Sequence, residues 1–317
     1  MEDQGPSSWY EAKPQLEKVK VEGNWGLTAF SVVVFVLSFL YVFSDQLDFV
    51  FYLVSVLFIH ELGHYLLMKR YKYQDLRMLF IPLMGAFVQG SKEKYSQKES
   101  FFVISAGPFP GIWIGSALLV FASIYQQEWM LELSFLFLFL NVINLFPIDP
   151  LDGGQLFKLY VNKKRDLFLM LFALFSSMLM IFVGWMIDSY IILAFGFLMG
   201  FKVRGFQRSH HLRKILDEKQ IPYESTYDDL SNEHYAKIKE VLIEETPALK
   251  KFLSMSEENN DEFLASHVNS ALLAPVSKDA GKAMKITIVC LWLLSLSFPV
   301  YLLASDVLDF GWYFEKL

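Results

Sequence analysis

Long apolar runs, separated by short polar turns, fill most of the chain. Six runs approach the roughly 20 residues that a helix needs to cross a bilayer. They lie at about 27 to 43, 49 to 68, 101 to 125, 133 to 148, 167 to 187 and 286 to 304. A seventh, at about 190 to 203, is shorter, but the basic residues beyond it favour a hairpin with the run before it. The pattern predicts an all-α polytopic membrane protein with about seven transmembrane helices.

The charges at the ends of these runs predict the orientation of the chain. Lysine and arginine gather near residues 69 to 77, 92 to 98 and 204 to 285. The positive-inside rule places these segments and the amino terminus in the cytosol, so we expect an integral multi-pass protein of the cell membrane. The predicted parts are a cytosolic amino-terminal segment at 1–26, a membrane core at 27–204, a cytosolic helical segment or linker at 205–285, a final transmembrane helix at 286–304 and an external tail at 305–317.

Two segments between the runs have patterns of their own. Residues 78 to 90 are apolar but are interrupted by Pro82, Gly85 and Gly90, so they are too short and broken for another crossing. They could form a short cytosolic-side strand or hairpin whose edge binds an extended peptide, or a plain interfacial loop. Within 205–285, residues 231 to 251 are expected to be helical, with Pro247 breaking or restarting the helix. That segment could also contact a protein partner.

The composition narrows the class of protein further. Hydrophobic residues make up 54% of the chain, more than a water-soluble domain could bury in runs of this length. The net charge is -6, and the basic residues stand beside apolar runs rather than on a broad basic surface, which argues against nucleic-acid binding. Cys290 is the only cysteine, so neither an intrachain disulfide nor a cysteine-based metal site can form. Any metal ion would have to use His, Asp or Glu.

The second apolar run contains the sequence His60-Glu61-Leu62-Gly63-His64. Helical spacing places both imidazoles on one face, one turn apart, which suits zinc. Glu61 lies on a different face, so it can act as a general base towards a water molecule without binding the metal. Charged groups inside the hydrocarbon are costly, and a bound cation would compensate them. The alternative is a packed polar cluster between helices.

The best candidate for a third ligand is Asp152. It follows the fourth run in the segment Asn144-Leu145-Phe146-Pro147-Ile148-Asp149-Pro150-Leu151-Asp152-Gly153-Gly154. Two prolines end the helix there, and two glycines permit a tight turn that could direct the carboxylate back into the bundle. A simple helix-terminating loop is the alternative, because Pro, Asp and Gly are common turn residues. The predicted topology places Asp152 and the two histidines at the same depth.

The paired motifs resemble the site-2 protease family of intramembrane zinc metalloproteases, peptidase family M50. The resemblance covers roughly residues 27 to 155 and includes the turn Ala106-Gly107-Pro108. It implies one zinc ion per chain, bound by His60, His64 and Asp152, with Glu61 as the catalytic base. It also implies that Asn144 donates a hydrogen bond to the developing oxyanion, although a helix-packing amide is the alternative. Asn141 is expected only to pack.

Several features lie outside that family pattern. There is no room for an inserted PDZ domain, 205–285 does not match a CBS pair, and the family core does not require the last span. The resulting hypothesis is a protease that hydrolyses transmembrane protein substrates in the bilayer, in regulated intramembrane proteolysis. One alternative is a catalytically inactive relative that binds a partner through 205–285. Another is a metal transporter that uses the same His and Asp side chains.

Overall fold

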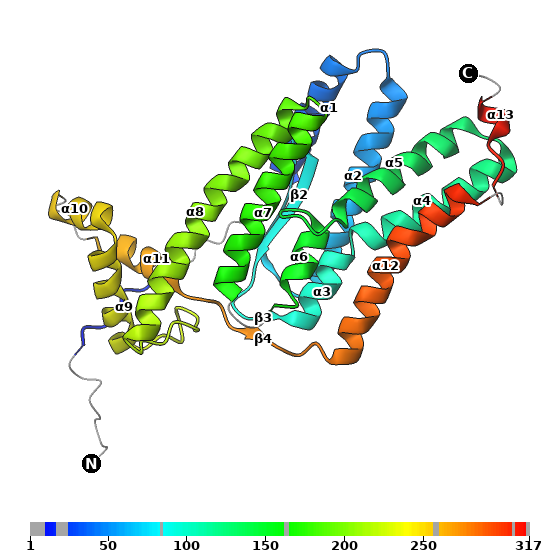
Figure 1. Ribbon diagram of the computed structural model, residues 1–317. Helices are drawn as coiled ribbons and strands as arrows, with labels where there is room; N and C mark the ends of the chain where they lie inside the picture. The colour runs from blue at the N-terminus through cyan, green and yellow to red at the C-terminus, as the bar shows by residue number, and fades with distance from the viewer. Residues whose placement is uncertain are drawn as a thin grey trace. The chain divides into compact units, whose positions relative to one another are not determined.

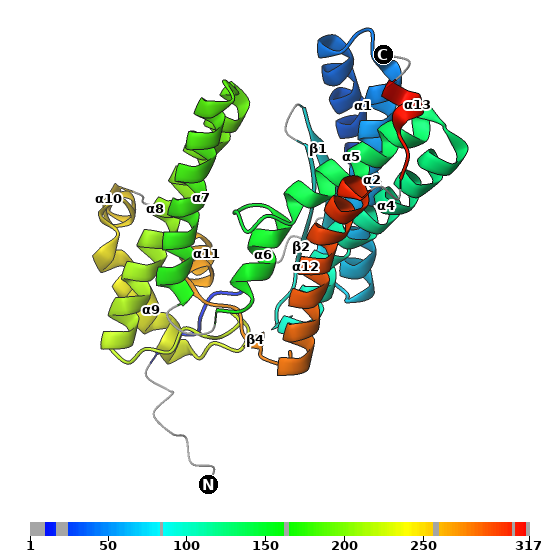
Figure 2. The same cartoon turned by 45° about the vertical axis from the view of Figure 1, so that its right-hand side comes forward.

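The computed structural model describes residues 10–16, 25–82, 85–161, 165–255, 260–305 and 308–314. The chain divides into two compact units. We call residues 20–92, 96–162 and 278–317 the site unit, and residues 1–19, 93–95 and 163–277 the helical unit. Figures 1 and 2 show the elements in two views. Each unit is described separately.

The site unit is built from helices with one strand hairpin inserted after the second helix (Figure 1). Its helices α3 and α4 form one long apolar segment that is broken at Ala106 and Gly107. Helix α12 comes from the far end of the sequence and packs on α4 and α5 (Figure 2). The elements are α1 (Trp25–Val42), α2 (Leu47–Arg70), β1 (Gln74–Ile81), β2 (Gly85–Ser91), α3 (Gln97–Ser105), α4 (Pro108–Tyr125), α5 (Glu128–Asn144), α6 (Asp152–Lys158), α12 (Lys282–Ala304) and α13 (Gly311–Phe314).

Five segments of the described chain are long and apolar enough to cross a membrane. They are α1, α2, the combined α3 and α4, α7 and α12, and they correspond to five of the predicted runs. The count of seven is not confirmed. The predicted run at 133 to 148 becomes α5, which has 17 residues because the chain leaves the helix after Asn144, before Pro147. The run at 190 to 203 becomes the first half of α8, which continues into a charged second half.

The segment at 78 to 90 forms the predicted hairpin. Strands β1 and β2 are antiparallel, with Met78 opposite Val88 and Ile81 opposite Gly85. The outer edge of β1 is covered by α1, where Thr28 Oγ1 donates to the Met78 carbonyl at 2.8 Å and the Phe80 amide donates to Ser31 Oγ at 3.2 Å. Strand β2 instead packs against α2. The hairpin therefore has one edge on β1, which α1 covers, and its other edge on β2.

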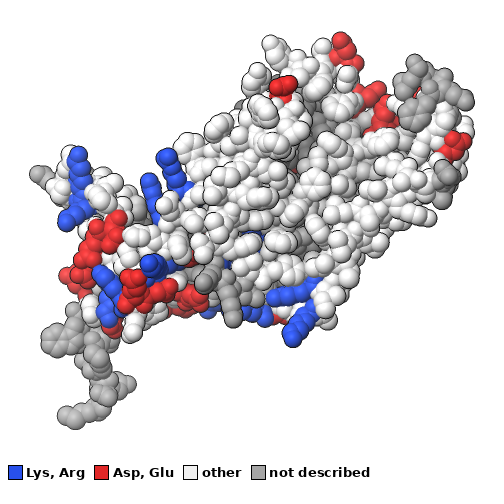
Figure 3. Space-filling view, in the orientation of Figure 1, with Lys and Arg blue, Asp and Glu red and all other residues white. Residues whose placement is uncertain are grey.

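The surface of the site unit shows why its helices suit a lipid environment. On the face drawn in Figure 3, uncharged side chains cover the middle of the helices, while acidic groups lie near the turn from α1 to α2 and basic groups near the start of α12. Large apolar side chains remain exposed on these helices, among them Phe30, Phe51, Phe139 and Ile286. Such a surface is stable in hydrocarbon and would be costly in water. The protein is a membrane protein.

The helical unit begins with an antiparallel hairpin of long helices (Figure 1). Small residues let α7 and α8 approach closely, and Ser177 Oγ donates to the Gly196 carbonyl at 2.7 Å. Strand β3 (Tyr95–Ser96) pairs with β4 (Val276–Ser277). The helices are α7 (Arg165–Met186), α8 (Tyr190–Glu218), α9 (Asn232–Glu245), α10 (Pro247–Met255) and α11 (Asp261–Ala271).

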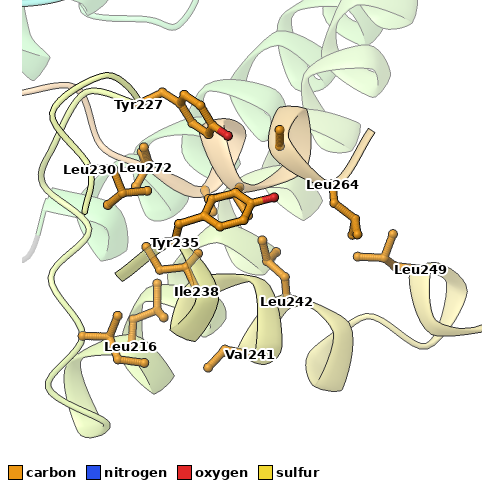
Figure 4. Close-up of a cluster of buried hydrophobic side chains, with 14 residues drawn as sticks. Leu216, Tyr227, Leu230, Tyr235, Ile238, Val241, Leu242, Leu249, Leu264 and Leu272 are labelled. Carbon is orange, nitrogen blue, oxygen red and sulfur yellow. The ribbon is translucent and has the colours of Figure 1, made fainter. Parts of the chain in front are cut away.

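An apolar core within the helical unit holds the 205–285 segment together (Figure 4). Tyr235, Ile238, Val241 and Leu242 form the buried face of α9, at the three- and four-residue spacing of an amphipathic helix. The segment at 231 to 251 is helical and restarts at Pro247, as expected, because α9 ends at Glu245 and α10 begins at Pro247. Proline is suited to this first position, where its missing N–H is not needed. In its described residues the segment contains the second half of α8 and the helices α9, α10 and α11.

The described part of the amino-terminal segment docks on this core. Lys13 Nζ donates to the carbonyls of Tyr227, Asp228 and Leu230 at 2.5, 2.9 and 2.6 Å. The Tyr227 hydroxyl donates to the Pro14 carbonyl at 2.8 Å. Burial lowers the pKa of the Lys13 ammonium, while the nearby Asp228 and Asp229 oppose that shift. Residues before the first membrane helix are thus joined to a loop more than 200 residues later.

Replacing Lys13 by Ala should release this docked segment. The three carbonyl contacts of a charged donor contribute together on the order of 2 kcal/mol, so amide exchange in residues 10–16 should become about tenfold faster or more. Hydrogen–deuterium exchange with mass spectrometry measures this directly. Glu11→Ala is the control, because Glu11 is exposed beside the same site. Equal exchange in the two variants would contradict the docking role.

Candidate metal centre

Helix α2 carries His60, Glu61 and His64 into the interior. Its sequence is apolar over most of 24 residues, with Asp48 in the first turn and two basic residues in the last turn, which complement the helix dipole. Its buried positions recur every three or four residues and end with the motif. His60, Glu61 and His64 are only 5%, 6% and 7% exposed. The motif therefore lies on the packed face of the helix.

The three predicted ligands come together in the structure. His60 Nε2 and His64 Nε2 lie 3.1 and 3.2 Å from Asp152 Oδ2, and the two Nε2 atoms are 3.2 Å apart. Among the described residues, these three form the group of His, Cys, Asp and Glu side chains that could hold a metal ion. The ligand atoms come from a membrane helix and from a loop 88 residues later. One ion could contact all three.

The outer nitrogens of both imidazoles have partners that set their tautomers. His64 Nδ1 lies 2.8 Å from the Val103 carbonyl, which can only accept, so Nδ1 carries the proton. His60 Nδ1 lies 2.7 Å from Asn141 Oδ1. The Asn141 amide nitrogen donates to the Phe137 carbonyl at 2.8 Å, so its oxygen faces His60 and accepts. Both Nε2 lone pairs are therefore free for a metal.

Asn141 has a more specific place than the sequence indicated. The prediction assigned it only a helix-packing role, because polar amides commonly join membrane helices. In the structure it is fully buried and it orients a predicted ligand. Nothing in the sequence distinguishes Asn141 from an ordinary packing amide, because its partner is 81 residues away. The three-residue spacing to Asn144 places the two amides on neighbouring faces of α5.

The break between α3 and α4 gives the histidines their space. A Cβ atom on Gly107 would lie 2.3 Å from His64 Nε2 and 2.8 Å from His60 Nε2. A Cβ atom on Gly63 would lie 2.0 Å from the Ala106 carbonyl oxygen. Both distances are shorter than atoms can approach, so glycine is required where α2 crosses the turn Ala106-Gly107-Pro108. The sequence identified this turn but not its function.

The Asp152 loop is held by close backbone contacts and a buried ion pair. Cβ atoms on Gly153 and Gly154 would lie 2.0 Å from the Leu145 oxygen and 2.4 Å from the Ile148 oxygen. Asp149 is fully buried, and Lys158 Nζ binds its carboxylate at 2.6 Å. A buried charge without its partner is strongly destabilising, so this pair holds the loop to α6. Asp152 begins α6 and is aimed inward by it.

Glu61 and Asn144 face a common cavity. The cavity has a volume of about 1040 Å³ and lies among α1, α2, α5 and the start of β2. Glu61 and Asn144 are among its lining residues, together with Leu151 next to Asp152. Glu61 thus stands outside the group of ligand atoms but beside it, as its place in the motif predicted.

The donor set indicates the kind of metal. Two neutral imidazoles and one carboxylate, with a cavity beside them, are the ligands of catalytic zinc sites, which keep a fourth position open. Magnesium and calcium prefer oxygen ligands throughout. The residues present therefore fit zinc, with His60, His64 and Asp152 as the groups that would hold it. The hydrogen bonds to Asn141 and Val103 supply the outer support that such sites use.

Replacing Asn141 by Ala should weaken metal binding while the three ligands remain. Loss of the His60 Nδ1 partner frees that ring to rotate, and comparable losses reduce metal affinity about 10- to 100-fold. Competition with a zinc chelator on the detergent-purified protein measures the affinity. Asn144→Ala is the matched control, because Asn144 lies on the same helix but contacts neither histidine. Equal weakening by both substitutions would contradict this assignment.

Replacing Gly107 by Ala should remove the metal. The added methyl group would occupy the space in front of both Nε2 atoms, so the metal content should fall from one ion per chain towards none. Elemental analysis after purification gives the content. Gly205→Ala is the control, since a Cβ atom there meets nothing within 4 Å. A full metal content in Gly107→Ala would show that the turn is not where the structure places it.

Known proteins are similar to the part of the chain that contains His60 and His64. Residues 48–137 match peptidase family M50. Stage IV sporulation protein FB of Bacillus subtilis (strain 168) is 34% identical over 114 residues, which are 35% of this chain and 40% of that protein. A zinc metalloprotease of Methanocaldococcus jannaschii is 30% identical over 121 residues, 37% of this chain and 34% of that protein. The chain thus spans less than half the length of these relatives.

A solved structure is also similar. The site-2 protease from Methanocaldococcus jannaschii has a TM-score of 0.43 and 19% identity, over 56% of this chain and 87% of that chain. The family match covers α2 with both histidines, α3, α4 and the part of α5 that precedes Asn141. With the HELGH sequence and the two curated relatives, this match shows that residues 48–137 are similar to peptidase family M50, the family that the motifs resemble.

Proposed function

We propose that the chain is a membrane zinc metalloendopeptidase that cleaves transmembrane segments of other membrane proteins. The observation that carries this proposal is the convergence of His60, His64 and Asp152 beside a buried glutamate that lines a large cavity. The relative from Methanocaldococcus jannaschii is named a zinc metalloprotease, which supports the same chemistry here. The reaction would release a fragment of the substrate, as in regulated intramembrane proteolysis.

The residues around the site have separate chemical roles in this proposal. Zinc, when bound, supplies a Lewis acid that polarises a water molecule and the scissile carbonyl. Glu61 takes a proton from the attacking water and passes it to the nitrogen of the leaving amine. Asn144 donates an N–H to the carbonyl oxygen as that oxygen gains negative charge. Asp152 and the two histidines keep their geometry through these steps.

The cavity suits an apolar peptide. Five phenylalanines line it, and it reaches Glu61. They are Phe35 and Phe39 from α1, Phe49 from α2, and Phe135 and Phe139 from α5. A substrate helix must unwind before its carbonyls become accessible, because helical carbonyls are already hydrogen-bonded. Gly85 and Ala86, at the start of β2, also line the cavity. An unwound segment could pair with the β2 edge, so the hairpin supports the proposal that the substrate binds in extended form.

The proposed setting follows from the predicted topology. We place the protein in the cell membrane with a cytosolic amino terminus, a membrane core at 27–204, a last membrane helix at 286–304 and an external tail at 305–317. The 205–285 segment would lie in the cytosol and could bind a protein partner. Its own apolar core supports a folded binding module. Fusions of reporter enzymes to each loop would test this topology.

Replacing Glu61 by Gln should separate metal binding from catalysis. The amide keeps the shape of the side chain but cannot accept the proton, so cleavage should fall by at least about 100-fold while one zinc per chain remains. His60→Ala should lose both the bound zinc and the cleavage activity. Comparing membrane-protein fragments from cells that carry wild type or Glu61→Gln measures cleavage without a known substrate.

These variants also distinguish the alternatives. Identical fragment patterns in wild type and Glu61→Gln would overturn the protease proposal. If zinc is then still bound, the chain would instead be a catalytically inactive relative. Metal uptake by cells that depends on His60 but not on Glu61 would point to a transporter.

A further inference from the structure

Helix α12, the last membrane helix, contacts the segment that carries Asp152 at two points. Trp292 Nε1 donates to the Leu145 carbonyl at 2.8 Å, and the Tyr160 hydroxyl donates to the Lys285 carbonyl at 2.8 Å. Lys285 and Trp292 are seven residues apart, which is close to two helical turns, so they lie on one face of α12. The sequence indicated no role for this helix.

The two hydrogen bonds bracket the proposed metal ligand. Leu145 ends α5 before the loop, and Tyr160 follows α6, so Asp152 lies between the two contacts along the chain. The Leu145 carbonyl also packs closely against Gly153, because a Cβ atom on Gly153 would lie 2.0 Å from the same oxygen. The carbonyl that Trp292 holds is therefore in contact with the residue next to Asp152.

Apolar side chains of α6 and α12 share one core cluster, in which Leu156 and Ile288 are buried. A pocket of about 310 Å³ also lies between the two helices, and its lining is almost wholly apolar. Its lining residues are Gly153, Leu156, Phe157, Tyr160, Ile288, Val289 and Trp292. Within a bilayer, an indole N–H without a partner is costly, which favours the bond to Leu145.

Other contacts of α6 act differently. The Asp149–Lys158 pair joins the loop to α6 itself, and Gln97 Nε2 donates to the Leu159 carbonyl from α3. The first sets the internal shape of the segment, and the second holds its far end. Trp292 contacts the near end of the segment from another helix, where the chain turns towards Asp152.

We propose that α12 is part of the support of the metal centre and that Trp292 is a positioning residue. It holds the Leu145 carbonyl and, through Gly153, keeps the Asp152 carboxylate at the distance that the two histidines require. Tyr160 supplies the second contact to the same helix. The proposal rests on the proposed function in one respect, namely that Asp152 is a ligand of the zinc ion.

Zinc affinity of the detergent-purified full chain tests this role without any substrate. Trp292→Phe keeps an aromatic ring but removes the donor, and we expect chelator competition to show about five- to tenfold weaker zinc binding. Tyr160→Phe should weaken binding in the same direction. Trp113→Phe is the matched control, because Trp113 lies on α4 and stacks on Phe298 instead of contacting the loop. Its affinity should equal that of wild type.

A double-mutant cycle separates positioning from general destabilisation. If Trp292 acts through Asp152, then Trp292→Phe should cause no further loss of zinc affinity in an Asp152→Ala background. An additive loss, or wild-type affinity in Trp292→Phe, would overturn the inference while leaving the metal site intact. If Trp292→Phe aggregates on size exclusion, Tyr160→Phe is judged by the same two criteria. Absence of zinc from wild type would instead overturn the proposed function.

Discussion

The structure of the site unit depends on the cost of burying three polar side chains in an apolar bundle. His60 and His64 are buried and Asp152 is partly buried, and together they bring two imidazoles and a carboxylate into contact. Such groups persist in a membrane only when each has a partner. The outer nitrogens of the histidines bond to α3 and α5, and the inner atoms converge on one point. The helices around the site are arranged so that these bonds can form.

Close approach of the backbone makes that arrangement possible. Gly63 and Gly107 let α2 pass the turn between α3 and α4, and Gly111 leaves room for the Asn141 side chain, from which a Cβ atom would be 2.3 Å away. Helices in lipid associate through such small residues, because the hydrophobic effect does not drive helices together in hydrocarbon and close packing must do so instead. The same glycines that bring the helices together also leave the space in which a metal ion would lie.

The site unit is built from segments that are far apart in the sequence. The helical unit is inserted in the sequence between α6 and α12, yet α12 belongs to the site unit and bonds to the Asp152 loop. The amino-terminal residues that precede α1 dock in the helical unit through Lys13.

The sequence by itself determined the elements whose signal is local. The HELGH spacing, the Pro- and Gly-rich loop with Asp152 and five of the seven expected spans follow from patterns within about 20 residues. The same patterns left residues 78 to 90 open between a hairpin and a loop, and the structure shows the hairpin. Tertiary structure decided what depends on distant partners. Asn141 differs from a packing amide only because His60 lies against it, and Trp292 differs from other membrane tryptophans only because the Leu145 carbonyl lies within reach. The ends of α5 and the continuation of α8 were likewise set by packing and by loop turns, because hydropathy alone does not record where a helix stops contacting its neighbours.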